Sequence, residues 1–172
     1  MWTVRNKKNN EKRVPFLGVM TALALVLSYI EHLIPIDPGI PGAKLGLANL
    51  VTLFTLYAAG PAEALSVGAV RIVLAGLLFG NLTAILYSMA GFLLSFAVMW
   101  LLKKTGRFGI TAISCTGGAA HNTGQLLAAA LLAGPGVLAS FPWLFACGTA
   151  AGILIGIPGS VLVKRLGNMV DL

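Results

Sequence analysis

Long apolar runs, separated by short clusters of proline, glycine or charge, constrain the fold of this chain more than any other feature. They show no alternation of apolar and polar residues with a period of two, which argues against the strands of a membrane barrel. A helix needs roughly 20 apolar residues to cross a bilayer. The runs therefore predict six transmembrane helices, near residues 15–35, 44–60, 62–80, 82–102, 108–133 and 139–163.

The composition agrees with a protein whose surface faces lipid. Hydrophobic residues make up 58% of the 172 positions and charged residues 10%, and the mean hydropathy is +0.91. A soluble domain of this length needs a far more polar surface. Because six spans use most of the chain, we expect one membrane domain over residues 15–166. A basic tail at 1–14 and a short tail at 167–172 flank it.

Basic residues form three clusters, which precede the first span, follow the fourth and follow the sixth. They are Arg5, Lys7, Lys8, Lys12 and Arg13, then Lys103, Lys104 and Arg107, then Lys164 and Arg165. In a chain with six spans all three clusters lie on one side, and such clusters stay in the cytoplasm. The sequence predicts an all-α, six-helix bundle in the cytoplasmic membrane with both termini inside. The net charge of +7 is assigned to orientation and to anionic lipid headgroups, and no nucleic-acid partner is expected.

Polar side chains inside the spans are costly, and they usually face a cavity or a partner. Arg71 lies about nine residues, roughly 13 Å, from either end of its span and therefore needs an acceptor. That acceptor is either a ligand or an ion-pair partner on another helix. His121, Asn122 and Gln125 cluster in the fifth span. They either bind a ligand or form hydrogen bonds between helices.

A segment rich in proline and glycine, 35–42, follows the first span and is stiff but able to turn tightly. It is either a lid over an outward-facing cavity or an ordinary polar connection. The predicted lid residues are Glu31, His32 and Asp37. The predicted ligand-binding residues are Lys44, Asn49, Arg71, Asn81, His121, Asn122 and Gln125. Arg71 and His121 are expected at the same depth, and together with several amides they suit an anionic or carbonyl-bearing small molecule.

Small residues recur at a spacing of four in the first and sixth spans. Gly148, Gly152 and Gly156 share one helix face, and so do Gly18 and Ala22. Such faces allow close approach of another backbone. They either pack within the bundle or dock a separate membrane partner, and these five residues are the candidate docking positions.

Catalysis by this chain alone is not expected. The sequence holds no phosphate-binding GxxxxGK[ST] motif, no GxSxG and no HExxH. Its five acidic residues are scattered singly, whereas diphosphate chemistry uses clustered carboxylates to hold Mg²⁺. No cofactor and no metal are predicted.

Three segments resemble the membrane family described as Gx transporter or heptaprenyl diphosphate synthase component I. They are PGAKLGLANL (41–50), RIVLAGLLFGN (71–81) and HNTGQLLAA (121–129), and the resemblance runs from about residue 14 to 166. That family is similar to the substrate-binding S components of energy-coupling factor (ECF) vitamin transporters. The resemblance implies an outward-facing ligand cavity, a lid after the first helix, and a separate transmembrane coupling protein with two ATPases.

The S components often carry Ala-x-x-x-Ala on helix one, which Gly18/Ala22 and Ala24/Ser28 only approximate here. The leading interpretation is a substrate-binding membrane component of a small-molecule transporter. The alternative is a non-catalytic membrane subunit of an isoprenoid-quinone biosynthetic or membrane electron-transfer assembly. A third interpretation is an intramembrane enzyme that uses His121.

Overall fold

The computed structural model describes residues 2–33 and 46–167. Every regular element in these two ranges is a helix, which confirms the all-α prediction. The helices are α1 (Trp2–Leu33), α2 (Leu47–Ala58), α3 (Pro61–Phe79), α4 (Leu82–Thr105), α5 (Ile110–Ala133), the 3₁₀ helix η1 (Pro135–Ser140) and α6 (Phe141–Leu166).

The helix ends follow from the local sequence. Gly60 and Gly134 take positive φ values of 121° and 97°, which a side chain would strain, and each is followed by a proline that starts the next helix. Asn81 caps α4, because its Oδ1 accepts a hydrogen bond of 2.8 Å from the Ala84 N–H. The predicted spans after the first therefore begin and end within a few residues of the observed helices, whereas α1 begins at Trp2, 13 residues before the predicted start of the first span.

Four helices in the described part of the chain are long and apolar enough to cross a bilayer: Lys12–Leu33, Pro61–Phe79, Leu82–Thr105 and Pro135–Leu166. α2 has 12 residues. At 1.5 Å per residue it reaches roughly 18 Å, less than the 30 Å hydrocarbon core. α5 has 24 residues but is not among the four apolar helices. The chain is thus a multi-pass membrane protein, and full crossing by α2 and α5 remains a prediction.

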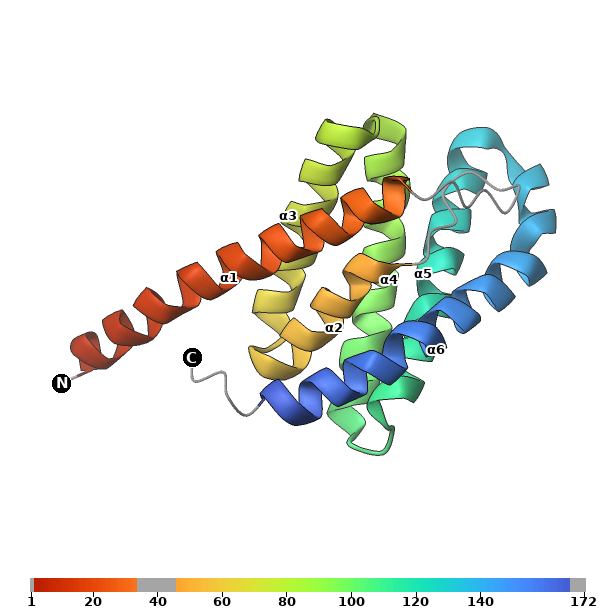
Figure 1. The fold of residues 1–172 in the computed structure, drawn as a ribbon. Helices are drawn as coiled ribbons and strands as arrows, with labels where there is room; N and C mark the ends of the chain where they lie inside the picture. Colours follow the sequence, from red (N-terminus) through yellow and green to blue (C-terminus); the bar gives the residue numbers. More distant parts are fainter. Residues whose placement is uncertain (1, 34–45, 168–172) are drawn as a thin grey trace.

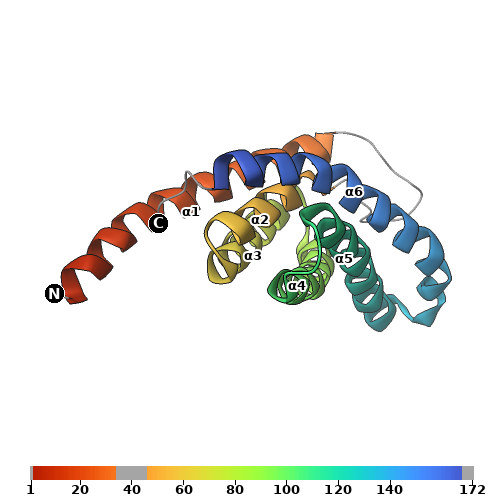
Figure 2. The same cartoon turned by 90° about the horizontal axis from the view of Figure 1, so that it is seen from below.

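The helices form two groups that lie side by side (Figures 1 and 2). In the N-terminal group, α1, α2 and α3 pack on one another; in the C-terminal group, α5 packs extensively on α4 and α6. The groups meet where α3 contacts α4 and α2 contacts α6. The largest buried cluster joins them and includes Leu53, Ile72, Phe92 and Ile113. Close packing of these side chains therefore holds the two groups together.

The glycines of α6 pack inside the bundle. A Cβ atom on Gly148 would lie 2.5 Å from the Gly118 carbonyl oxygen, and one on Gly152 would lie 2.5 Å from the Ser114 carbonyl oxygen. At Gly156 the nearest backbone atom, the Cα of Thr111, would be 2.9 Å away. Of the two alternatives, packing within the chain is therefore the one observed. The assignment of these three glycines to a separate partner is corrected, because α5 already occupies the face.

The candidate docking face on α1 is different. Gly18 and Ala22 are exposed, and a Cβ atom on Gly18 would meet no atom within 4 Å among the described residues. This face is uncovered in the described chain. Its docking role stays a prediction.

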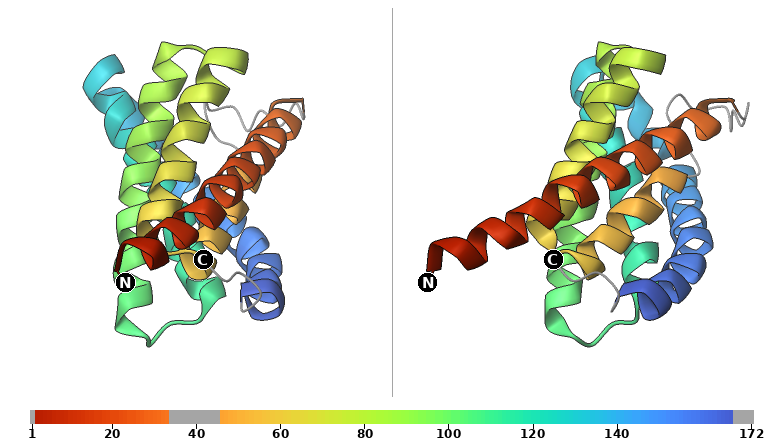
Figure 3. Two further views of the ribbon diagram at one scale, coloured as in Figure 1. Left: turned by 90° about the vertical axis from the view of Figure 1, so that its left-hand side faces the viewer. Right: turned by 60° about the vertical axis from the view of Figure 1, so that its left-hand side comes forward.

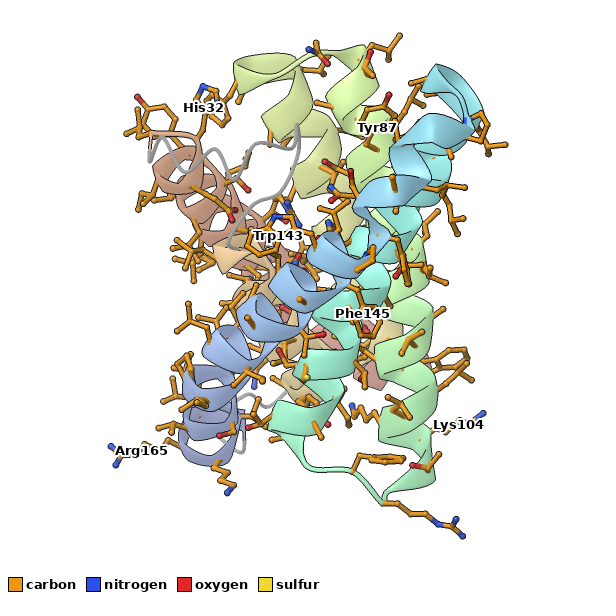
Figure 4. All side chains as sticks on the ribbon, turned by 90° about the vertical axis from the view of Figure 1, so that its right-hand side faces the viewer. His32, Tyr87, Lys104, Trp143, Phe145 and Arg165 are labelled. Atoms are coloured by element: carbon orange, nitrogen blue, oxygen red, sulfur yellow. The ribbon has the colours of Figure 1, made fainter. Side chains whose placement is uncertain are left out.

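The start of α1, the end of α6 and the α4–α5 connection lie at one end of the bundle, and the α3–α4 connection lies at the other (Figures 1 and 3). Figure 4 places Lys104 and Arg165 at the first end, far from His32 and Tyr87 at the second. The three basic clusters thus share one end, here called the basic end. That this end faces the cytoplasm is a prediction from the charge rule.

Candidate ligand cavity

A cavity of about 80 Å³ lies between the two helix groups and takes lining residues from all six α-helices. One water molecule needs roughly 10–15 Å³ of such space, so the cavity has room for a small molecule. His32, Phe79, Gly80 and Ala84 line it near the end opposite the basic end. Its polar lining is Ser28, Glu31, His32, Asn49, Arg71, Ser88, Ser95, Ser114, His121, Asn122 and Gln125.

Arg71 lies midway along α3 and is the cation of the described cavity wall. Its Nη2 donates a hydrogen bond of 3.2 Å to Oδ1 of Asn49, in the first turn of α2. The Arg71 Nε atom is buried and has no hydrogen-bond partner in the described part of the chain. An unsatisfied N–H of a buried guanidinium is costly, because neither water nor protein compensates its lost hydration. The Arg71 Nε–H is thus a donor of the cavity wall for which the described residues supply no acceptor.

Glu31 lies at the end of α1 and is only 9% exposed. Its carboxylate accepts a hydrogen bond from the backbone N–H of Gly46, which precedes α2, and its charge interacts favourably with Arg71. Predicted as a lid residue, Glu31 is part of the cavity wall. His32 also lines the cavity, with its ring 6.1 Å from the Phe79 ring between centroids. Asp37 and the segment 35–42 lie outside the described residues.

The polar cluster of α5 faces the same cavity. His121, Asn122 and Gln125 all line it. Asn122 is buried, and its Nδ2 donates a hydrogen bond of 2.8 Å to the Leu144 carbonyl oxygen of α6. The hydrogen bond between helices that the sequence left as an alternative therefore exists for Asn122. α4 approaches the cluster closely at Gly91, where a Cβ atom would lie 2.7 Å from the Gln125 Cγ.

The structure brings most of the predicted ligand-binding residues together. Asn49, Arg71, His121, Asn122 and Gln125 line one cavity, although they come from three helices. Arg71 and His121 therefore share a cavity, which the sequence could not show.

Two of the predicted positions are not in this group. Asn81 is exposed, is not among the lining residues and caps α4 instead. It follows the last turn of α3, so its amide serves the next helix rather than the cavity. Lys44 lies outside the described residues.

Four serines on the cavity wall were missed from the sequence. They are Ser28, Ser88, Ser95 and Ser114. A single serine in a membrane helix is common, and its hydroxyl often bonds to its own helix. One signal was present, because Ser88 and Ser95 are seven residues apart and therefore share a face of α4.

The apolar helices, with a polar cavity between them, define a multi-pass helical membrane protein. Within the described residues, no group of three His, Cys, Asp or Glu side chains is placed to hold a metal ion. The family model described as heptaprenyl diphosphate synthase component I matches residues 20–162, and the chain belongs to this family. The resemblance to the heptaprenyl diphosphate synthase component I family that was inferred from the sequence is thereby confirmed. No curated protein and no solved structure matches the chain significantly.

Proposed function

We propose that this protein is the substrate-binding membrane component of a transporter for a small polar molecule. The observation that carries the proposal is Arg71, which lines a cavity between apolar helices and keeps a buried Nε–H for which no described residue supplies an acceptor. Buried arginines are normally compensated by partners, and Asn49 and Glu31 compensate only part of this one. An oxygen atom of a ligand would supply the missing acceptor.

The remaining wall supports the same proposal. His121 and Gln125 add side chains that both donate and accept hydrogen bonds, as a site for a polar ligand requires. In the predicted orientation the cavity is reached from outside the cell, past His32 and Phe79. This arrangement agrees with the resemblance to ECF S components. The uncovered face at Gly18 and Ala22 is where a separate coupling protein would dock.

The alternative is a non-catalytic membrane subunit of an isoprenoid-quinone biosynthetic or membrane electron-transfer assembly, and the family description names one component of a synthase. Co-purification of the tagged protein from its native membrane distinguishes the candidates. A transmembrane coupling protein and ATPases support the transporter component. A soluble prenyl synthase or redox proteins support the second candidate.

The cavity itself is tested by substitution. Arg71→Gln and His121→Ala should each reduce the amount of co-purifying small molecule by roughly tenfold or more, because a charge-assisted hydrogen bond contributes about 1.5–3 kcal/mol. Mass spectrometry of an extract of the purified protein measures this amount. Arg107→Gln is the matched control, since Arg107 is exposed in the α4–α5 connection.

Folding of each variant is checked by elution from a size-exclusion column in detergent. Folded variants that retain the molecule at the level of the control place the site elsewhere. If both variants lose the folded state while the control keeps it, the two side chains are structural and the proposal is wrong.

A further inference from the structure

The charges on the described part of the cavity wall sum to zero. In the described residues the wall holds one arginine, Arg71, and one carboxylate, Glu31, with histidine counted as neutral. The two side chains come from α3 and α1, and α2, α4 and α6 add no charged group to the described lining. The site is therefore a paired site and not a cationic one.

A paired site discriminates against ligands with a net charge. An anion that approaches Arg71 is attracted by the guanidinium but repelled by the nearby Glu31 carboxylate, so the two terms oppose each other. The cost of removing the anion from water is then not recovered. A ligand whose charges cancel avoids this cost, as does an uncharged ligand with strong hydrogen-bonding groups.

The uncharged residues of the lining also favour a ligand without net charge. Ser28, Ser88, Ser95 and Ser114 supply hydroxyls, and Asn122 and Gln125 supply amides. Hydroxyls and amides both donate and accept, which matches uncharged polar groups. The buried Oγ of Ser28 has no hydrogen-bond partner among the described residues, so a second wall atom besides the Arg71 Nε is left for a ligand.

We propose that the cavity selects a small ligand that is neutral overall, either uncharged or zwitterionic. The ligand places a carbonyl or carboxylate oxygen against the Arg71 Nε and directs any positive group toward Glu31. This inference rests on the proposed function and narrows the anionic or carbonyl-bearing class that the sequence predicted. The net charge of the wall, and not Arg71 alone, sets the preference.

Three molecules of equal shape test the proposal: acetate, acetamide and acetamidinium, which are anionic, neutral and cationic. All three are small enough for the cavity. Binding to the full chain in detergent is measured by saturation-transfer NMR at mildly alkaline pH, where an unperturbed imidazole is neutral. The protein should bind acetamide more tightly than either ion. Glu31→Gln should reverse the order, raising the preference for acetate over acetamide by roughly tenfold or more, because the repulsion is removed and Arg71 remains.

Glu63→Gln is the matched control. Glu63 pairs with Arg13 at 3.4 Å and does not line the cavity, so this variant should keep the order of the wild type. A wild type that prefers either ion overturns the inference, and so does a folded Glu31→Gln variant with an unchanged order; both leave the proposed function standing. A wild type that binds none of the three contradicts the proposed function as well. If Glu31→Gln does not fold, the order measured for the wild type alone decides.

Discussion

Glycine residues set how closely the helices of the C-terminal group approach. Gly118 of α5 and Gly148 of α6 face each other, and each would place a Cβ atom into the backbone of the other helix. Without an aqueous hydrophobic effect between lipid-exposed helices, such close packing is a main source of helix association in membranes. The same contact positions Asn122, whose Nδ2 would lie 2.9 Å from a Cβ atom on Gly148. The glycines therefore also shape the cavity wall.

Gly148→Ala should destabilise the protein by about 1–3 kcal/mol, because the added methyl group overlaps the Gly118 carbonyl oxygen and overpacks the interface. Thermal unfolding in detergent, followed by circular dichroism, measures the change. Gly18→Ala is the control, since a methyl group there meets no described atom within 4 Å. Alanine is the better helix former, so the control should be as stable as the wild type or more stable. Equal stability of both variants would contradict the packing role.

At the scale of elements, α2 is the helix whose position most needs explanation. It is short, and its C-terminal end lies within the basic end of the bundle. Lys103 of α4 holds this end, because its Nζ donates a hydrogen bond of 2.5 Å to the Leu56 carbonyl oxygen and lies 4.7 Å from the centroid of the Tyr57 ring. A cation at a helix C-terminus satisfies the unpaired carbonyls and the helix dipole. The other end of α2 carries Asn49, so this anchor helps to position the partner of Arg71.

Lys103→Met should destabilise α2 relative to the remaining helices. The free energy of local unfolding of α2 should fall by about 1–3 kcal/mol, because the charged hydrogen bond and the ring contact are lost. Hydrogen–deuterium exchange of the last turn of α2 should increase. Lys104→Met is the matched control: Lys104 is exposed and lies 5.3 Å from the Trp100 ring centroid of its own helix. The control should leave exchange in α2 unchanged. Faster exchange in both variants would show that Lys103 acts only through the general charge of this end.

On the scale of the whole molecule, the two ends of the bundle differ in charge and in access to the cavity. The basic end carries the start of α1, the end of α6 and the α4–α5 connection, and the cavity approaches the opposite end. If the basic end is cytoplasmic, the cavity lies toward the outside of the cell. A transporter component that binds its ligand from outside requires such a cavity. The orientation in the membrane is therefore the property on which the direction of ligand entry depends.

Single cysteines in a background with Cys115→Ser and Cys147→Ser test this orientation. Lys104→Cys and Lys164→Cys should react with an impermeant maleimide only from the cytoplasmic side, and Gly136→Cys only from outside. All three positions are exposed, and Gly136 lies in η1, between α5 and α6. Labelling of positions 104 and 136 from the same side would contradict the predicted topology.

Much of the candidate site could be predicted because a polar residue in an apolar helix is conspicuous. Arg71 and the α5 cluster at His121, Asn122 and Gln125 were identified by this argument alone, and they line one cavity. Asn81 and the α6 glycines were misassigned for a physical reason. In the sequence, an asparagine that caps a helix looks the same as one that binds a ligand. A face of small residues likewise does not reveal which helix covers it.

The sequence by itself determined the class of the protein, the positions of the helix breaks and the grouping of its basic residues into three clusters outside the apolar runs. These features depend on local hydropathy and local backbone preferences. The tertiary structure decided which faces meet. It placed Glu31 in the wall near Arg71, turned the α6 glycines toward α5 and brought α3 and α5 to one cavity. These contacts join residues far apart in the chain. Their pairing depends on how whole helices pack, and no local pattern of residues specifies that.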